Sequence, residues 1–222
     1  MSAALFLHGL AGVVFDCDGV MIDSREANTI FYNRVLAYFG LPPMTAEQER
    51  YSFMATAMQA LLYIVPPKLH SQIGYVVSNV VLYDRDIVPL LRLKPGFKDF
   101  IDELHSRGVR MAVHTNRTLQ GMQTVLDIFS LPSYFSPVVA ADMVTPKPSP
   151  EGAVRICEDW GCNPTSVLFV GDSNHDKMAA EGAGLVFAAM GNNDLRGQIT
   201  VRDFKELRAA LADVLPPVIW HR

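Results

Sequence analysis

Three kinds of feature are scarce in this sequence, and each scarcity argues against a class of protein. Cysteine occurs only as Cys17, Cys157 and Cys162, with no CxxC pair, so we expect neither a disulfide framework nor a structural zinc site and predict a reducing, cytoplasmic setting. No apolar run approaches the ~20 residues that cross a bilayer, so no membrane partner is expected. The 19 basic residues are outnumbered by 23 acidic ones, and a net charge of −4 disfavours a nucleic-acid partner held by bulk electrostatics.

Apolar residues, by contrast, are abundant. Half of the 222 residues are hydrophobic, which suffices for one large domain or for a core domain with a smaller module. The sequence shows no internal repeat and no low-complexity tract. We therefore expect a globular protein with a substantial buried core.

Strand and helix patterns alternate along most of the chain. Short apolar runs predict strands over residues 10–15, 109–114, 134–140, 166–170 and 185–189. Helical spacing predicts helices over residues 97–107, 118–129, 150–160, 176–181 and 203–215. Continuous apolar strands that alternate with helices are typical of a parallel sheet buried on both sides. The predicted fold class is thus α/β, with a Rossmann-like parallel sheet and helices on both of its faces.

A helical segment interrupts this alternation near the N-terminus. Helical spacing begins after Ser24, a candidate N-cap, and stops before the prolines that follow Leu41. A second helix is predicted from Thr45, with an apolar face that extends to Leu62, and a third over residues 68–83. We therefore expect a core domain of residues 1–22 and 92–222, with an all-α insertion of residues 23–91.

Polar residues follow three of the predicted strands. Asp16 and Asp18 come after the first, Thr115 and Asn116 after another, and Asp172 after a third. Ligands of such sheets bind beyond the carboxyl ends of the strands, so we expect these side chains to converge on one crevice. Two carboxylates at the end of a buried strand are expensive to desolvate unless a cation or a proton neutralises them. The alternative is an aspartate-rich turn that caps the next helix.

These residues, in this order, resemble the four motifs of the haloacid dehalogenase superfamily of phosphotransferases. The motifs are Asp16-Cys17-Asp18-Gly19-Val20 with Asp23-Ser24, Val113-His114-Thr115-Asn116, Lys147-Pro148-Ser149-Pro150, and Gly171-Asp172-Ser173-Asn174-His175-Asp176. Each motif alone is weak, but four in the right order make a specific signal. The insertion after the first motif resembles the small α-helical cap of the phosphoglycolate phosphatase and β-phosphoglucomutase branch.

The resemblance implies catalytic and metal-binding roles for the acidic residues. Asp16 is the implied nucleophile, which becomes an aspartyl phosphate, and Asp18 protonates the leaving alkoxide and then activates water. Asp172, Asp16 and the backbone carbonyl of Asp18 are the implied ligands of Mg²⁺, a hard cation that offsets repulsion between a carboxylate and a phosphate.

The resemblance also implies a phosphate-binding set. Thr115 and Asn116 donate hydrogen bonds to the transferring phosphoryl group, and Lys147 neutralises charge on the nucleophile and the phosphate. Gly19 allows backbone N–H groups to approach the phosphate.

For several other polar residues, the sequence allows either a functional or a purely structural interpretation. Arg50 and Arg117 could reach a substrate anion, but solvated surface positions are favoured for both. His175 is expected near the metal without ligating it, and Asp176 either supports the metal site or is a helix N-terminal carboxylate. His114 alternates away from the threonine that follows it, so we expect it in the core.

The function that this pattern favours is hydrolysis of a small organic phosphomonoester, with a phosphorylated metabolite as partner. Asp18 argues against a dehalogenase or a phosphonate hydrolase, because neither branch typically carries an acid/base at that position. A phosphomutase of the β-phosphoglucomutase type is the alternative, since it makes the same phosphoenzyme. A non-catalytic phosphometabolite-binding protein is a third reading, disfavoured because Asp16, Asp18, Lys147 and Asp172 are all present. A monomer and a homodimer are both compatible with the sequence.

Overall fold

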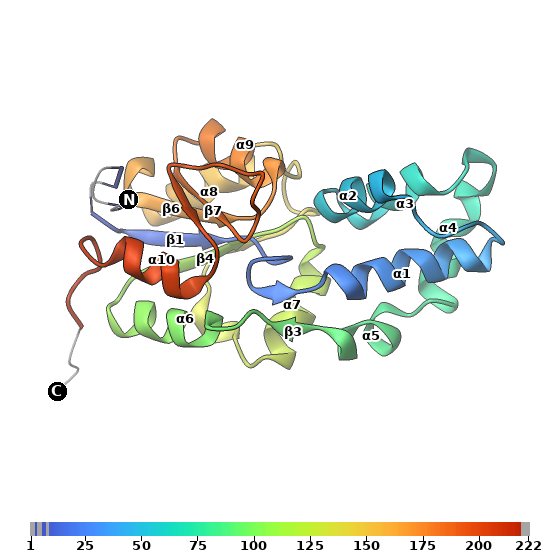
Figure 1. Ribbon diagram of the computed structural model, residues 1–222, viewed down its shortest axis with the longest axis horizontal. Helices are drawn as coiled ribbons and strands as arrows, with labels where there is room; N and C mark the ends of the chain where they lie inside the picture. Colours follow the sequence, from blue (N-terminus) through green and yellow to red (C-terminus); the bar gives the residue numbers. More distant parts are fainter. Residues whose placement is uncertain (1–2, 4–5, 8, 219–222) are drawn as a thin grey trace. The chain divides into compact units, whose positions relative to one another are not determined.

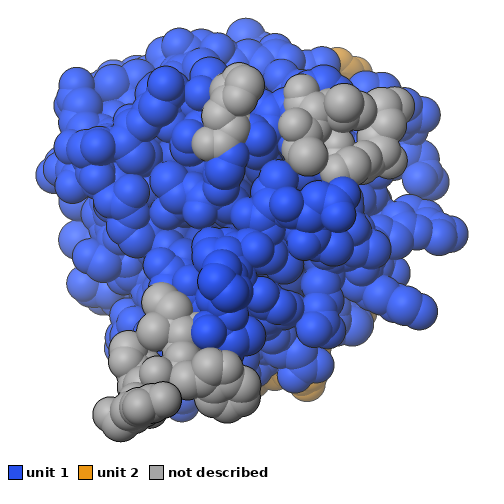
Figure 2. Space-filling model, turned by 90° about the vertical axis from the view of Figure 1, so that its left-hand side faces the viewer, with its two compact units in different colours: residues 1–21, 93–222 blue, residues 22–92 orange. Residues whose placement is uncertain are grey.

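The computed structural model describes residues 3, 6–7 and 9–218, which fall into two compact units (Figures 1 and 2). Unit 1 comprises Met1–Met21 and Leu93–Arg222, and unit 2 comprises Ile22–Arg92. The chain thus leaves unit 1 and returns to it, with unit 2 as a continuous insertion. The two units are described separately below.

Unit 1 is built on a six-stranded parallel sheet. Its strands are β1 (Gly12–Phe15), β4 (Arg110–His114), β5 (Val138–Val139), β6 (Val167–Gly171), β7 (Val186–Met190) and β8 (Ile199–Val201). Their order is β5-β4-β1-β6-β7-β8, and every neighbouring pair is parallel. The predicted fold class is confirmed. The sequence analysis missed β8, a three-residue strand with only two buried residues.

Helices cover both faces of this sheet (Figure 1). The helices of unit 1 are α6 (Phe97–Ser106), α7 (Leu119–Ile128), α8 (Glu151–Trp160), α9 (Asn174–Gly182) and α10 (Phe204–Leu211), with short 3₁₀ turns at Pro132–Tyr134 and Pro164–Ser166. In Figure 1, α8 and α9 lie above the sheet, and α6 and α10 lie below it. Each end predicted from the sequence lies within a few residues of these bounds, except that α10 ends at Leu211 rather than at Leu215.

Side chains that alternate along β1 pack into hydrophobic cores on both faces of the sheet. Successive strand residues point to opposite faces, so Val14 and Phe15 serve different sides of the sheet. Val14 belongs to a buried cluster with residues of α8 and α9, such as Ile156 and Ala180. Phe15 packs edge-on against Phe97 of α6, with ring centroids 5.7 Å apart. Burial on both faces holds β1 in the centre of the sheet and fixes where the chain emerges after it.

Unit 2 is helical apart from short extended segments at its ends. Its helices are α1 (Arg25–Tyr38), α2 (Ala46–Met54), α3 (Ala57–Ile64), α4 (His70–Asn79) and α5 (Tyr83–Asp86), with 3₁₀ turns at Pro67–Leu69 and Val88–Leu90. The segments β2 (Ile22–Asp23) and β3 (Arg92–Leu93) pair in a separate two-stranded sheet.

Two expectations for unit 2 were wrong. The helix predicted from Thr45 to Leu62 is two helices, because Thr56 starts a new one with a capping box to Gln59. The third predicted helix ends at Asn79 instead of continuing to residue 83. Ser24 does occupy the N-cap position of α1, but its side chain makes no capping hydrogen bond.

Across the described part of the chain, each helix is too short or too polar to traverse a lipid bilayer.

Candidate active site

Three adjacent strands of unit 1 deliver the predicted site residues to one edge of the sheet. β4, β1 and β6 are neighbours and parallel, so their carboxyl ends lie at the same edge. Asp16 follows β1 and its backbone N–H donates to Val170 of β6 at 3.0 Å. Thr115 follows β4, and Asp172 follows β6. Residues more than 150 positions apart in the sequence are thus brought together by strand pairing alone.

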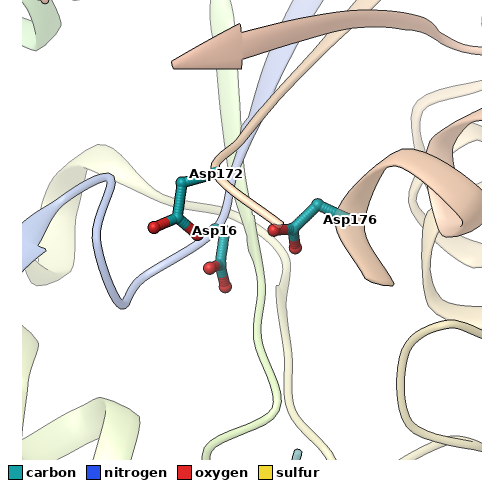
Figure 3. A group of neighbouring side chains, drawn as sticks. All are labelled: Asp16, Asp172 and Asp176. Atoms are coloured by element: carbon teal, nitrogen blue, oxygen red, sulfur yellow. The ribbon is translucent and has the colours of Figure 1, made fainter. Parts of the chain in front are cut away.

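Three carboxylates gather at this edge (Figure 3). Oxygen atoms of Asp16, Asp172 and Asp176 lie within 4.8 Å of one another. Asp16 and Asp176 are buried, and Asp172 is half-buried. Figure 3 shows Asp16 and Asp172 with adjacent carboxylates and Asp176 reaching in from the start of α9. So many like charges at one buried place require positive charge nearby.

Lys147 supplies part of that charge. Its Nζ donates to Asp16 Oδ1 and to Asp176 Oδ1, both at 2.6 Å, and the residue is only 4% exposed. Burial alone would lower the pKa of Lys147, but the two carboxylates outweigh it and raise the pKa well above its usual value. The lysine is therefore a fixed cation at this site.

Asn116 and Lys147 hold each other through side chain and main chain. The Asn116 side-chain oxygen accepts from the Lys147 backbone N–H at 2.9 Å, and its amide nitrogen donates to the Lys147 carbonyl at 3.1 Å. The loop that carries the lysine is thereby tied to the end of β4. The predicted contact of Asn116 with a phosphoryl group stays a prediction.

The electrostatics of Asp16 fit a site that takes a further cation. Burial, and then repulsion by Asp176, raise the pKa of Asp16 to about 7, although Lys147 opposes the rise. One ammonium group therefore does not balance three neighbouring carboxylates. Hard carboxylate oxygens are the donors that Mg²⁺ prefers, so the residues present fit this ion.

Asp176 is held by protein donors through both of its oxygens. Oδ1 accepts from Lys147, while Oδ2 accepts from the Ser173 hydroxyl and from the Ser173 backbone N–H. Ser173 and Asp176 form the capping box of α9. Asp176 is thus a carboxylate at the N-terminus of a helix that also contacts Lys147, and its predicted support of a metal site stays a prediction. Ser173 was missed, although a serine three residues before an acidic residue is a readable signal.

Gly19 makes room for Asp172. Its φ is +81°, and a Cβ placed on it would lie 2.0 Å from Asp172 Oδ2. A side chain at position 19 would therefore displace this carboxylate. The absence of a side chain on Gly19 thus leaves space for the carboxylate of Asp172. The predicted role of Gly19 at the phosphate stays a prediction.

Arg117 is not a solvated surface residue, so that expectation was wrong. Its Nε and Nη2 donate to Oδ2 and Oδ1 of Asp18, each at 2.7 Å, and its side chain is 10% exposed. Its backbone N–H also donates to the Thr115 hydroxyl at 3.1 Å. A single arginine after the second motif gives no periodic signal, and its partner is 99 residues away.

Of the remaining candidates, His114 and Arg50 occupy the environments that the sequence analysis favoured, while the predicted place of His175 near a metal stays a prediction. His114 is buried, and its ring nitrogens have no hydrogen-bond partner among the described residues. Burial, and then the nearby Lys147, lower the pKa of His114 to about 3. His175 is half-buried, and Arg50 lies exposed on α2 of unit 2.

Comparisons with known proteins place these observations in context. Residues 13–190 match the family model described as haloacid dehalogenase-like hydrolase. Phosphoglycolate phosphatase 1 from Pseudomonas aeruginosa is 31% identical over 186 residues, which cover 80% of this chain and 68% of that protein.

Solved structures of other proteins are also similar to this chain. A HAD-superfamily hydrolase of subfamily IA, variant 1, from Geobacter sulfurreducens is 36% identical with a TM-score of 0.73, and the match covers 92% of this chain and 98% of that one. A mutant of CbbY from Rhodobacter sphaeroides, in complex with xylulose-1,5-bisphosphate, has a TM-score of 0.77 at 21% identity, with 91% of this chain and 99% of that one covered. At that identity the similarity is one of fold.

Proposed function

The chain belongs to the haloacid dehalogenase-like hydrolases, and we propose that it is a Mg²⁺-dependent phosphatase that hydrolyses a small organic phosphomonoester through an aspartyl phosphate on Asp16. The family relation predicted from the four motifs is confirmed, as is the assignment to the hydrolases. The observation that carries the mechanism is the setting of Asp16. This buried carboxylate directly follows β1, contacts the fixed cation of Lys147 and adjoins further carboxylates that suit a metal ion.

The proposed chemistry has two steps. A carboxylate oxygen of Asp16 attacks phosphorus, the bond from phosphorus to the leaving oxygen breaks, and Asp18 gives that oxygen a proton. Asp18 then takes a proton from water, whose oxygen attacks phosphorus and releases phosphate from Asp16. Lys147 faces the same nucleophile throughout and offsets the negative charge that the phosphoryl group brings.

The proposed metal ligands are the carboxylates of Asp16 and Asp172 and the backbone carbonyl of Asp18. When bound, Mg²⁺ neutralises charge between the nucleophile and the phosphate. Asp176 is proposed to act on this site through Lys147, because its two oxygens are occupied by Lys147 and Ser173. The donor set and the unbalanced charge around Asp16 support this assignment.

The proposed substrate is a small phosphorylated metabolite. Relatives named phosphoglycolate phosphatase make phosphoglycolate the first compound to test. Unit 2 is proposed to be the family's helical cap, which selects the substrate. Free Cys17, Cys157 and Cys162 are compatible with the cytoplasmic setting predicted from the sequence.

Phosphate release from a panel of phosphomonoesters tests the proposal. The panel contains phosphoglycolate, sugar phosphates, nucleotides and an aryl phosphate, each with Mg²⁺ and with EDTA. Metal-dependent release by the wild type, lost in Asp16→Asn, is the expected result. Interconversion of sugar phosphates without net release would instead identify a mutase. Binding without turnover would identify the non-catalytic alternative.

A further inference from the structure

Arg117 forms an ion pair with Asp18. Asp18 is the residue that acts as acid and base in the proposed function, and the present inference rests on that function. Both Asp18 oxygens accept from one guanidinium group, in the two-pronged geometry that gives arginine–carboxylate pairs their strength. A carboxyl group that carries a proton cannot accept both of these bonds in the same way. At least one must open before Asp18 can give a proton to a leaving oxygen.

The pair is also anchored, which restricts how it can open. The Arg117 backbone is fixed by its N–H on Thr115 Oγ1 and by its carbonyl, which accepts from the Ala141 N–H at 2.9 Å. Asp18 lies in a turn closed by a hydrogen bond from the Met21 N–H to the Cys17 carbonyl at 2.9 Å. The exchange must therefore occur in the side chains, while both loops keep their places.

Burial determines what can replace Asp18 on the arginine. The Arg117 side chain is 10% exposed, so leaving its guanidinium without an anion is unfavourable. The other buried cation of the site, Lys147, is already committed to Asp16 and Asp176. The group that takes over Arg117 must bring its own negative oxygens, and the substrate is the molecule that arrives at this point in the cycle.

We propose that Arg117 is a specificity-determining residue that exchanges Asp18 for a second anionic group on the substrate's leaving portion, and that this exchange frees Asp18 for acid–base work. The substrate class is a phosphomonoester whose leaving alcohol carries a carboxylate or a second phosphate. Either group offers paired oxygens that match the guanidinium fork. A substrate with a neutral leaving group leaves Arg117 on Asp18 and is turned over less well.

Substrates that differ only in the leaving group distinguish binding of that group by Arg117 from an effect of Arg117 on every phosphomonoester. Phosphoglycolate and ethyl phosphate differ by a carboxylate in place of a methyl group, and ethylene glycol bisphosphate carries a second phosphate instead. The value of kcat/KM is measured for all three with wild type, Arg117→Met and Arg117→Lys. Arg155→Met is the control, because Arg155 is an exposed arginine on α8.

Arg117→Met is expected to lower kcat/KM for at least one of the two anionic substrates by roughly ten- to hundredfold, the range for a lost charged hydrogen bond. It is expected not to lower kcat/KM for ethyl phosphate, because Arg117 stays on Asp18 when that substrate binds. The anionic substrate that loses more identifies the group that Arg117 binds. Arg117→Lys keeps the charge without the fork, so an intermediate loss is expected. This variant also retains a cation beside Asp18, which keeps the test valid if Arg117→Met does not fold.

Equal losses for all three substrates would place Arg117 on the shared phosphoryl group or on Asp18 alone, and would overturn the exchange. Unchanged values for all three would overturn it as well. These results differ from failure of the proposed function, in which the wild type itself releases phosphate from none of the three substrates.

Discussion

Replacing Gly19 by alanine tests the proposed metal site through a single methyl group. The new Cβ would lie 2.0 Å from Asp172 Oδ2, whereas ordinary contacts begin near 3.4 Å. The carboxylate must therefore move by more than an ångström or the turn must distort. The left-handed φ of +81° adds a backbone cost of about 1–2 kcal/mol for any residue with a Cβ.

Gly161→Ala is the matched control for the backbone term. Gly161 also has a positive φ, +59°, at the end of α8, but a Cβ there would meet nothing within 4 Å. The backbone term should cost both variants about 1–2 kcal/mol of unfolding free energy, a fall in Tm of roughly 2–8 °C for a chain of this size, and the clash with Asp172 adds to the loss in Gly19→Ala. Only Gly19→Ala should disturb Asp172.

Thermal unfolding with and without Mg²⁺, together with phosphate release, measures the difference. Because an error of about 1 Å at a reacting centre can cost roughly a hundredfold in rate, Gly19→Ala should lose about that factor in kcat/KM. It should also lose most of the rise in Tm that Mg²⁺ gives the wild type. Gly161→Ala should keep both. Equal activity and equal response to Mg²⁺ in the two variants would refute the placement of Asp172 in the metal site.

Three further substitutions test the electrostatics of the site. In the absence of metal, the raised pKa of Asp16 means that the folded state binds a proton that the unfolded state has lost, so the stability of the wild type falls as pH rises from about 4 to about 7. The unfolding free energy of Asp16→Asn minus that of the wild type should therefore grow by about 3 kcal/mol between pH 5 and pH 8, and denaturant titrations that show no such growth would contradict the account. His114 has the opposite dependence: its pKa is lowered to about 3 in the folded protein, so stability is full above pH 6.5 and is lost as pH falls below it. His114→Phe should reduce that loss by about 2 kcal/mol at pH 5 relative to pH 7.5, and parallel pH curves for the two proteins would count against it. Asp18→Asn should slow the first turnover of an alkyl phosphate far more than that of a nitrophenyl phosphate, whose leaving group needs no proton; rapid-quench assays with equal losses for the two would remove Asp18 as the acid.

The convergence of the site on one sheet edge could be predicted because it depends on strong local patterns. Apolar runs gave the three strands that bring Asp16, Thr115 and Asp172 together, and parallel pairing then leaves little freedom in where their ends lie. The buried position of His114 followed in the same way from strand alternation.

The parts that could not be predicted depend on long-range pairing or on weak signals. The contact of Arg117 with Asp18 joins loops 99 residues apart, and nothing in the local sequence distinguishes such an arginine from a solvated one. The capping boxes at Thr56 and Ser173 were visible as residue types at the right spacing. At Thr56 the continuous apolar pattern outweighed that signal, and two helices were taken for one.

The central claim is that Asp16 carries the phosphoryl group, and borohydride trapping tests it most directly. An acyl phosphate on Asp16 is reduced by borohydride to homoserine, which mass spectrometry of the peptide can locate. The account predicts homoserine at position 16 when a turned-over phosphomonoester and Mg²⁺ are both present, and none when either is left out. Steady turnover with position 16 unchanged, or with the modification at another residue, would contradict it.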